Sequence, residues 1–168
     1  MKVIETRVYT IEELSAEAKE KAREWYKEID DMPFLEDDMQ ETLQDLLKKA
    51  KIECKDAKVF YSLSYSQGDG AMFEGVCTFK GHAIQVKQSG HYYHYNSKEI
   101  TYLDFVGEDK EGKEEAIAEA FEAKYTEVCK ELAKAGYAYM EDAHSDSTID
   151  DTLSANEYTF TETGKRFG

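Results

Sequence analysis

Apolar and polar residues alternate in some parts of the chain and recur at helical spacing in others. Residues 2–9 alternate, which predicts a half-buried strand. Thr10 and Glu13 have the spacing of a capping box, in which two side chains bond backbone N–H groups at a helix start. The next apolar residues recur every three or four positions and predict a helix ending near Asp30. Its expected buried stripe is Leu14, Ala18, Ala22, Trp25, Tyr26 and Ile29.

A second helix is predicted after Pro33, the single proline of the sequence, because proline is tolerated at the first positions of a helix. The apolar residues that follow keep helical spacing, and the positions between them are rich in Asp and Glu. One face of this helix is therefore expected to lie against the core and the other to be acidic. The expected inward residues are Leu35, Met39, Leu43, Leu46, Leu47 and Ala50.

From Ala57 onward the apolar period falls to two, which is typical of strands. Short runs are separated by hairpin-length turns such as Lys80-Gly81 and Ser89-Gly90. No helical crossover separates the runs, so we expect an antiparallel meander of four or five strands. The runs are KVFYSLSY (58–65), AMFEGVCTF (71–79), HAIQVKQ (82–88), HYYHY (91–95) and KEITYLDFV (98–106).

A polar loop at residues 107–114 leads to a long predicted helix, which Gly136 is expected to interrupt or cap. Its expected buried stripe is Ile117, Ala120, Phe121, Tyr125, Val128, Cys129 and Leu132. A short helix to about Ala155 and a strand at residues 157–161 follow. This order predicts an α+β fold, an antiparallel sheet of about five or six strands with three or four helices packed on one face. Without a repeat or linker, residues 1–168 are expected to form a single domain.

The charge of the chain changes the picture of its surface. Asp and Glu number 36 against 21 Lys and Arg, a net charge of −15. Such a chain should be repelled by nucleic-acid phosphates and attracted to basic surfaces, so direct nucleic-acid binding is not expected. Eight acids and no Lys or Arg lie between Glu28 and Asp45, which indicates either an acidic interaction face or an ordinary solvated surface. The candidate face is Asp30, Asp31, Glu36, Asp37, Asp38, Glu41 and Asp45, and a second acidic region is Glu141, Asp142, Asp146, Asp150 and Asp151.

Several classes of protein are disfavoured by what the sequence lacks. No apolar run reaches the roughly 18 residues of a membrane span, and the first residues show no signal-peptide pattern. Cys54, Cys77 and Cys129 are odd in number and lack CxxC spacing, which disfavours a disulfide framework or structural zinc and suits a reducing cytoplasm. Signatures of phosphate-binding loops, zinc proteases and serine hydrolases are absent. We therefore expect no cofactor or metal and favour a non-catalytic role, with an enzyme left open.

The sequence SQGDG between two aromatic runs has two interpretations. Gly68 and Gly70 permit positive φ, and Asp69 can bond the nearby backbone, as in a bulged hairpin turn. Alternatively, the glycines let a ligand approach closely, with aromatic rings as flat contact surfaces. The candidate binding loop is Ser66, Gln67, Gly68, Asp69, Gly70, His91, Tyr93 and His94. His91 and His94 should point to opposite faces of their strand, which weakens a shared metal site with Asp69.

Four segments follow one another along most of the chain: VYTIEELSAEAKEKAREWY, SYSQGDGAMFEG, GHYYHY and ANEYTFTETGK. Together they resemble a widespread family of small uncharacterised phage and prophage proteins. The chain differs from that pattern in having Met72 where a Cys is common, and in a shorter connection between its hairpins. The resemblance implies origin in a phage or mobile element and cytoplasmic action inside a bacterium. Members of the family are sometimes labelled antitoxins of toxin–antitoxin systems.

Three functions are consistent with these patterns. In the first, the acidic face imitates phosphates and inhibits a basic, nucleic-acid-handling host protein, in the manner of an anti-CRISPR or other anti-defence protein. In the second, the SQGDG loop binds or converts a small ligand such as a nucleotide, although the nearest cations in sequence are Lys58, Lys80 and Lys87. In the third, the chain is an antitoxin without a DNA-binding helix-turn-helix pattern. The first is favoured, with a CRISPR effector or another nuclease as the partner class.

Overall fold

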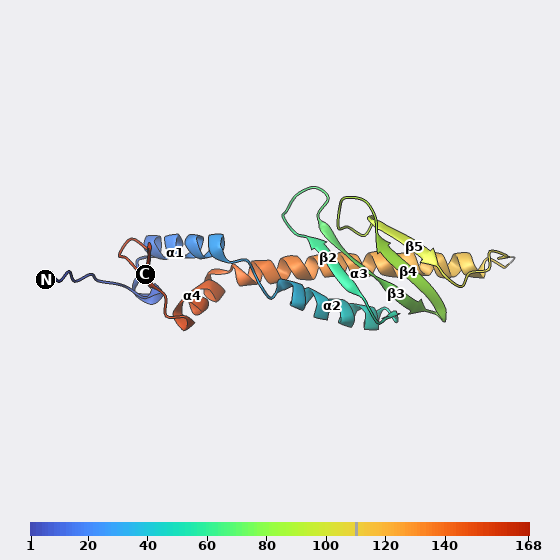
Figure 1. The fold of residues 1–168 in the computed structure, drawn as a ribbon, viewed down its shortest axis with the longest axis horizontal. Coiled ribbons are helices and arrows are strands. Elements are labelled where there is room, and N and C mark those ends of the chain that lie inside the picture. Colours follow the sequence, from blue (N-terminus) through green and yellow to red (C-terminus); the bar gives the residue numbers. More distant parts are fainter. Residues whose placement is uncertain (110) are drawn as a thin grey trace. The chain divides into compact units, whose positions relative to one another are not determined.

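The computed structural model describes residues 1–109 and 111–168, so position 110 in the predicted polar loop lies outside the description. The chain divides into two compact units, residues 1–33 with 139–168 (unit 1) and residues 34–138 (unit 2). The chain contains helices, an antiparallel five-stranded sheet and a two-stranded hairpin, which confirms the predicted α+β class (Figure 1). The single domain expected over residues 1–168 stays a prediction, because two compact units can fold together as one domain.

Unit 1 contains the short 3-10 helix η1 (Ile11–Glu13), helices α1 (Ala16–Ile29) and α4 (Asp146–Ala155), and the hairpin of β6 (Thr159–Phe160) and β7 (Arg166–Phe167). Tyr9 forms an isolated bridge to the hairpin, with its N–H 2.9 Å from Phe160 O and its O 2.8 Å from Phe160 N–H. Trp25 contacts the rings of Tyr158 and Phe160 edge-on. The core of unit 1 is Ile11, Leu14, Ala18, Ala22, Ile149, Leu153 and Phe160.

The strand predicted at residues 2–9 is wrong. Residues 1–8 are exposed and belong to no strand of the described structure, and Tyr9 makes the single bridge given above. An alternating pattern forms a strand where a neighbouring strand supplies backbone partners along its length. Within residues 1–9, Tyr9 is the one residue that pairs with the backbone of another described residue, Phe160.

The predicted capping box is confirmed, but it opens η1 rather than the longer helix. Thr10 N–H donates to the Glu13 carboxylate at 2.8 Å. Helix α1 then begins after Ser15, whose hydroxyl accepts a hydrogen bond from Ala18 N–H at 3.3 Å. The end of α1 near residue 30 is as predicted, whereas the predicted burial of Ile29 is wrong, because its side chain is 52% exposed.

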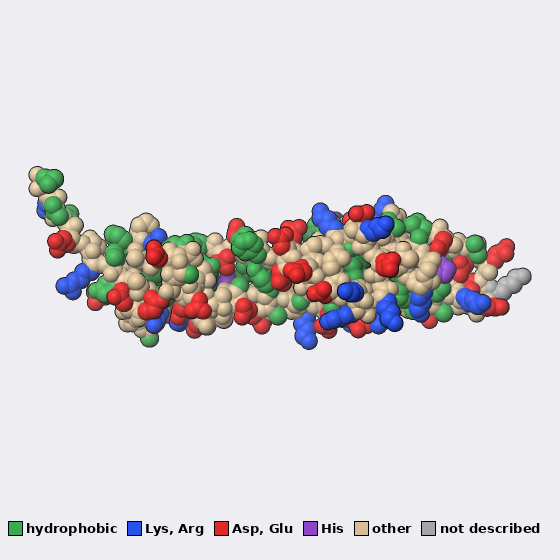
Figure 2. Space-filling model, turned by 90° about the horizontal axis from the view of Figure 1, so that it is seen from below, with side chains coloured by type: hydrophobic (Ala, Val, Ile, Leu, Met, Phe, Trp, Pro, Cys, Tyr) green, Lys and Arg blue, Asp and Glu red, His purple; other side chains and the backbone are tan. Residues whose placement is uncertain are grey.

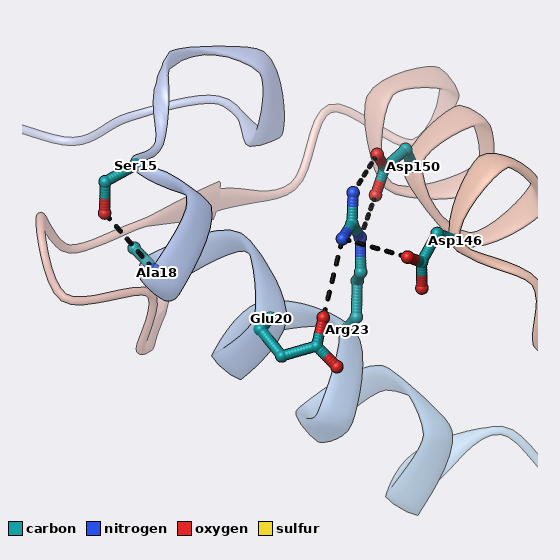
Figure 3. Close-up of polar contacts among 6 residues, drawn as sticks. All are labelled: Ser15, Ala18, Glu20, Arg23, Asp146 and Asp150. Atoms are coloured by element: carbon teal, nitrogen blue, oxygen red, sulfur yellow. Dashed lines mark hydrogen bonds and ion pairs between the residues drawn. The ribbon is translucent and has the colours of Figure 1, made fainter.

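Arg23 joins α1 to α4 within unit 1 (Figure 3). Its Nε and Nη2 donate to the two carboxylate oxygens of Asp150 at 2.8 and 2.7 Å. Its Nη1 lies 3.3 Å from Asp146 and 3.5 Å from Glu20. The hydrogen bonds to Asp150 hold the pKa of Arg23 above its ordinary value. Two residues of the second acidic region, Asp146 and Asp150, thus have a structural partner.

We expect Asp150→Asn to lower the free energy of unfolding by about 1–3 kcal/mol, because Arg23 keeps its charge in a partly buried position without its bidentate partner. Asp151→Asn is the matched control: it removes the same charge at an exposed position that forms no ion pair in the described residues. The control should change stability by less than about 0.5 kcal/mol. Urea unfolding measures both variants, and equal effects would contradict this role of Arg23.

Unit 2 consists of helix α2 (Leu35–Lys49), five strands and α3 (Lys113–Ala143) up to residue 138. The strands are β1 (Glu53–Cys54), β2 (Lys58–Ser62), β3 (Gly70–Phe79), β4 (His82–Gln88) and β5 (Lys98–Tyr102). They pair antiparallel, and β2 to β5 pair in chain order, which confirms the meander. Gln40 ties α2 to the sheet by accepting Val59 N–H at 3.1 Å, and α3 packs its Phe121 ring 5.6 Å from that of Phe79.

The two edges of β3 are covered differently. On one edge, β2 pairs with residues 70–74 and β1 pairs with Cys77 and Thr78. On the other edge, β4 pairs with residues 75–79, so in the described structure residues 70–74 lack a strand there. The Tyr125 hydroxyl from α3 fills part of this gap: it donates to Phe73 O at 2.9 Å and accepts Phe73 N–H at 3.3 Å. Tyr125 is fully buried, and burial raises its pKa.

The strand predicted at residues 91–95 is wrong, because residues 89–97 form an irregular loop between β4 and β5. The neighbouring strands are also shorter than predicted, with β2 ending at Ser62 and β5 at Tyr102. The 89–97 loop packs beside the strandless edge of β3 without continuing the ladder, as the contacts of its side chains show below.

The predicted interruption at Gly136 is also wrong, because α3 continues through Gly136 to Ala143. Gly136 is buried, and a Cβ at this position would lie 2.5 Å from Leu63 Cδ1 and 3.1 Å from Met39 Cε and Sδ. Glycine here therefore allows α3 to pack closely against α2 and the residue that follows β2.

Gly136→Ala should destabilise the protein even though alanine is the better helix former by about 1 kcal/mol. The added methyl group overpacks the site, and such overpacking costs about 1–3 kcal/mol. The double variant Gly136→Ala with Leu63→Ala should lose less stability than the sum of the two single variants, since Leu63 is the nearest neighbour of the added methyl group. Thermal unfolding followed by circular dichroism checks this, and a higher midpoint for Gly136→Ala alone would contradict close packing.

Candidate functional site

Asp69 organises the loop between β2 and β3. Its Oδ1 lies 3.1 Å from the hydroxyls of Ser62 and Ser64 and 3.0 Å from that of Ser66, each of which donates to it. Its Oδ2 accepts the backbone N–H groups of Ser64 and Ser66. The serines stand at every second position, so successive hydroxyls of the bent chain surround one carboxylate.

Tyr137 of α3 adds a further donor to the same carboxylate. Its hydroxyl donates to Asp69 Oδ2 at 2.6 Å and accepts Tyr65 N–H at 3.2 Å. The Tyr65 and Tyr137 rings lie 4.6 Å apart. The hydrogen bond from Tyr137, with those from the serines, holds the pKa of Asp69 well below its ordinary value. A carboxylate offers about four lone pairs, so these six donors occupy its acceptor capacity.

The two glycines of the loop are in contact with the 89–97 loop, which lies beside it (Figure 1). A Cβ on Gly68, whose φ is +87°, would lie 2.8 Å from the Tyr92 ring. A Cβ on Gly70 would lie 2.9 Å from His94 Cδ2. Tyr93 also packs its ring 5.4 Å from that of Phe60. The glycines therefore make room for neighbouring residues of the same chain.

The two histidines of this region have different surroundings. His94 Nδ1 accepts Asn96 N–H at 3.1 Å, so in the neutral ring the proton is on Nε2. Burial, with Lys130 and Lys98 nearby, lowers the pKa of His94. His91 is exposed. Within the described residues, no group of three or more His, Cys, Asp or Glu side chains could hold a metal ion.

The structure brings most of the predicted loop residues together. Ser66 and Asp69 are bonded to each other, and Gly68 and Gly70 lie against the loop that carries His94. Gln67 and His91 are exposed and, among the described residues, contact no polar partner. Sequence reasoning missed Ser62, Ser64, Tyr92 and Tyr137. The alternating serines were a readable signal, whereas Tyr137 lies 68 residues from Asp69 and gave none.

The predicted acidic face is divided between the two units. Asp30 and Asp31 belong to unit 1, where Asp30 accepts Met32 N–H at 3.1 Å and lies 3.1 Å from His144 Nε2. The other five residues lie on α2 in unit 2: Glu36, Asp37, Asp38, Glu41 and Asp45. These five form no ion pair with any described residue. Elsewhere acidic and basic side chains intermingle on the face shown in Figure 2.

Comparison with family models, with curated proteins and with solved structures gives no match. Along residues 1–109 and 111–168, none of the helices combines the length and the apolar character needed to cross a membrane.

Asp69→Asn should lower the unfolding midpoint, because an amide cannot accept all the donors that surround the carboxylate. The lowered pKa of Asp69 gives this effect a pH dependence. The stabilisation is complete above the ordinary Asp pKa of about 3.9 and is lost as the pH falls through the lower pKa of the folded state. The midpoint difference between wild type and variant should therefore be constant from about pH 7 to about pH 5 and shrink below about pH 4.

Asp56→Asn is the control for this experiment, since Asp56 is an exposed carboxylate of unit 2. Its midpoint should follow that of the wild type at each pH. A midpoint of Asp69→Asn that equals the wild type at neutral pH would contradict the structural role of the carboxylate.

Proposed function

We propose that this chain is a non-catalytic binding protein whose acidic α2 stripe (Glu36, Asp37, Asp38, Glu41 and Asp45) docks on a basic, nucleic-acid-handling host protein and inhibits it. The observation that carries the proposal is the position of Glu41 and Asp45 on an exposed helix face without a cationic partner in the described residues. The carboxylates of the stripe imitate the phosphates that a basic, nucleic-acid-binding groove of the partner protein would normally contact.

The acids of α2 do not all have the same explanation. Glu36, Asp37 and Asp38 lie in the first turn, where negative charge stabilises the helix dipole. Glu41 and Asp45 lie beyond that turn and repeat the spacing of four that begins at Asp37. Like charges four residues apart destabilise a helix by about 0.2–0.5 kcal/mol per pair. The helix therefore carries a small energetic cost at Glu41 and Asp45, which supports a role in binding.

An apolar residue beside the stripe supports a protein partner. Phe34, which directly precedes α2, is 68% exposed. Protein interfaces combine aromatic anchors with charged surroundings, and aromatic residues are enriched among those that dominate affinity. The resemblance to phage and prophage proteins supports a setting in the bacterial cytoplasm and an anti-CRISPR or other anti-defence role, with a CRISPR effector or another nuclease as the partner class.

The other two functions have less support. At the SQGDG loop the acceptor capacity of Asp69, the charged residue of the candidate ligand site, is already used by its own chain. An antitoxin would also bind a protein partner, but that partner would be a toxin. Identification of the partner therefore distinguishes an antitoxin from the proposed inhibitor.

The double variant Glu41→Gln with Asp45→Asn tests the proposal. The tagged chain is used to capture proteins from a bacterial lysate, which are identified by mass spectrometry. We expect nucleic-acid-handling proteins to be recovered at about 0.1 M salt and lost near about 1 M, where the Debye length falls from about 10 to about 3 Å. The double variant should recover at least about tenfold less, which corresponds to about 1.4 kcal/mol.

The control is Glu115→Gln with Glu119→Gln, which removes the same charge at the same spacing from exposed positions of α3. It should capture as the wild type does. The α2 variant should unfold at the same or a higher temperature, because a repulsive pair has been removed. Equal capture by both variants, or capture of a toxin in place of a nucleic-acid-handling protein, would overturn the proposal.

A further inference from the structure

Cys54 and Cys77 lie opposite each other on the neighbouring antiparallel strands β1 and β3. Residues in direct register across an antiparallel pair have Cα atoms about 4.5 or about 5.5 Å apart. Both separations fall inside the range of about 4.4–6.8 Å that a disulfide spans. Both cysteines are free thiols in the structure. Their positions therefore allow a cross-link without movement of the backbone.

Gly75 leaves room for the Cys54 sulfur. A Cβ at this position would lie 2.4 Å from Cys54 Sγ, so the sulfur could not keep its position beside any other residue. Gly75 and Cys77 are on the same face of β3, since they are two residues apart in a strand. The Cys54 side chain therefore points to the face that carries Cys77.

The two thiols differ in acidity and access. A hydrogen bond from Cys77 lowers the pKa of Cys54, which is half-exposed. The same hydrogen bond, burial and the nearby Cys54 charge raise the pKa of Cys77, which is buried. Cys129 is also buried, and burial raises its pKa to about 12. Because the thiolate is the reactive form, Cys54 is the thiol that should react first.

Cys54 is reached from a surface cleft at the end of α2. The cleft has a volume of about 480 Å³ and is lined by Cys54 together with residues of α2 and the segment around β1. Two lysines, Lys48 and Lys55, and two acids, Asp45 and Glu53, are among its walls. This volume admits a small thiol or disulfide, and the lysines supply cations for the carboxylates of such a molecule.

We propose that Cys54 and Cys77 are a reversible redox site that forms a disulfide by exchange with a low-molecular-weight disulfide such as oxidised glutathione. The Cys54 thiolate attacks one sulfur of the reagent, which gives a mixed disulfide and releases one small thiolate. Cys77 then loses its proton to water, and its sulfur attacks Cys54 Sγ and displaces the second small thiolate. The two protein thiols lose two electrons, and the reagent is reduced to two thiols.

The second step is made easier by the first. The pKa of Cys77 is raised by the hydrogen bond with Cys54, by burial and by the charge of the Cys54 thiolate. In the mixed disulfide the Cys54 sulfur carries no charge, so the repulsion between a Cys54 thiolate and a Cys77 thiolate is absent. The resulting cross-link would enclose residues 54–77, the segment that contains β2 and the Asp69 loop.

The full chain is incubated with oxidised glutathione, the remaining thiols are alkylated, and the peptides are mapped by mass spectrometry. Before alkylation, we expect a loss of about 2 Da in the intact mass. After unfolding and alkylation, we expect a peptide pair linked through Cys54 and Cys77 and an alkylated Cys129. The unfolding midpoint should rise by about 5 °C or more and return to its original value after dithiothreitol treatment. Glutathione that remains on Cys54, a link that involves Cys129, or unreacted Cys54 would overturn the proposal.

Two variants separate the two steps. Cys77→Ala should keep glutathione on Cys54 as a stable mixed disulfide, because the resolving thiol is absent. Cys129→Ala should form the same cross-link as the wild type. Should Cys77→Ala fail to fold, the peptide map of the wild-type chain decides the question by itself.

Discussion

The bond between the Tyr125 hydroxyl and the backbone of Phe73 is the interaction on which the packing of unit 2 depends. Residues 70–74 of β3 have no strand on the β4 side in the described structure, which would leave a buried N–H and C=O without partners. A buried backbone group without a hydrogen bond costs about 1–3 kcal/mol. Because the hydroxyl both donates and accepts, one residue of α3 satisfies both groups and fixes the helix against the sheet.

This arrangement explains where the Asp69 loop lies. β4 stops short of the first half of β3, so the 89–97 loop occupies the space beside Gly70. The same half of β3 begins directly after Asp69, whose carboxylate is held by the serines and by Tyr137 of α3. Both tyrosines thus use a hydroxyl on α3 to complete the hydrogen bonding of the β2–β3 hairpin. The Asp69 carboxylate and the two glycines of SQGDG are accounted for by this architecture. The five acids of the α2 stripe form no ion pair with a described residue.

Local patterns predicted the elements that local interactions determine. The helical spacing located α1 and α2, and glycine turns located the β3–β4 hairpin. The pattern failed for residues 2–9, which alternate as strands do, and for the short aromatic run 91–95. Neither segment has a neighbouring strand along its length in the described structure. Gly136 was wrongly predicted to interrupt the helix. A glycine is needed there because the side chains of Leu63 and Met39, far away in sequence, pack against it. The pairing of Cys54 with Cys77 and the bond between Tyr137 and Asp69 depend in the same way on tertiary packing.

The end-to-end placement of β1 and β2 along one edge of β3 has a consequence for self-association. A long, flat edge strand invites addition of a strand from another molecule and is a common origin of aggregation. Here that outer edge is split into two short pieces, and the opposite outer edge is β5, which begins with the charged residues Lys98 and Glu99. One rim of the sheet is thus divided and the other is a single five-residue strand that begins with two charges, features that disfavour edge-to-edge pairing between molecules.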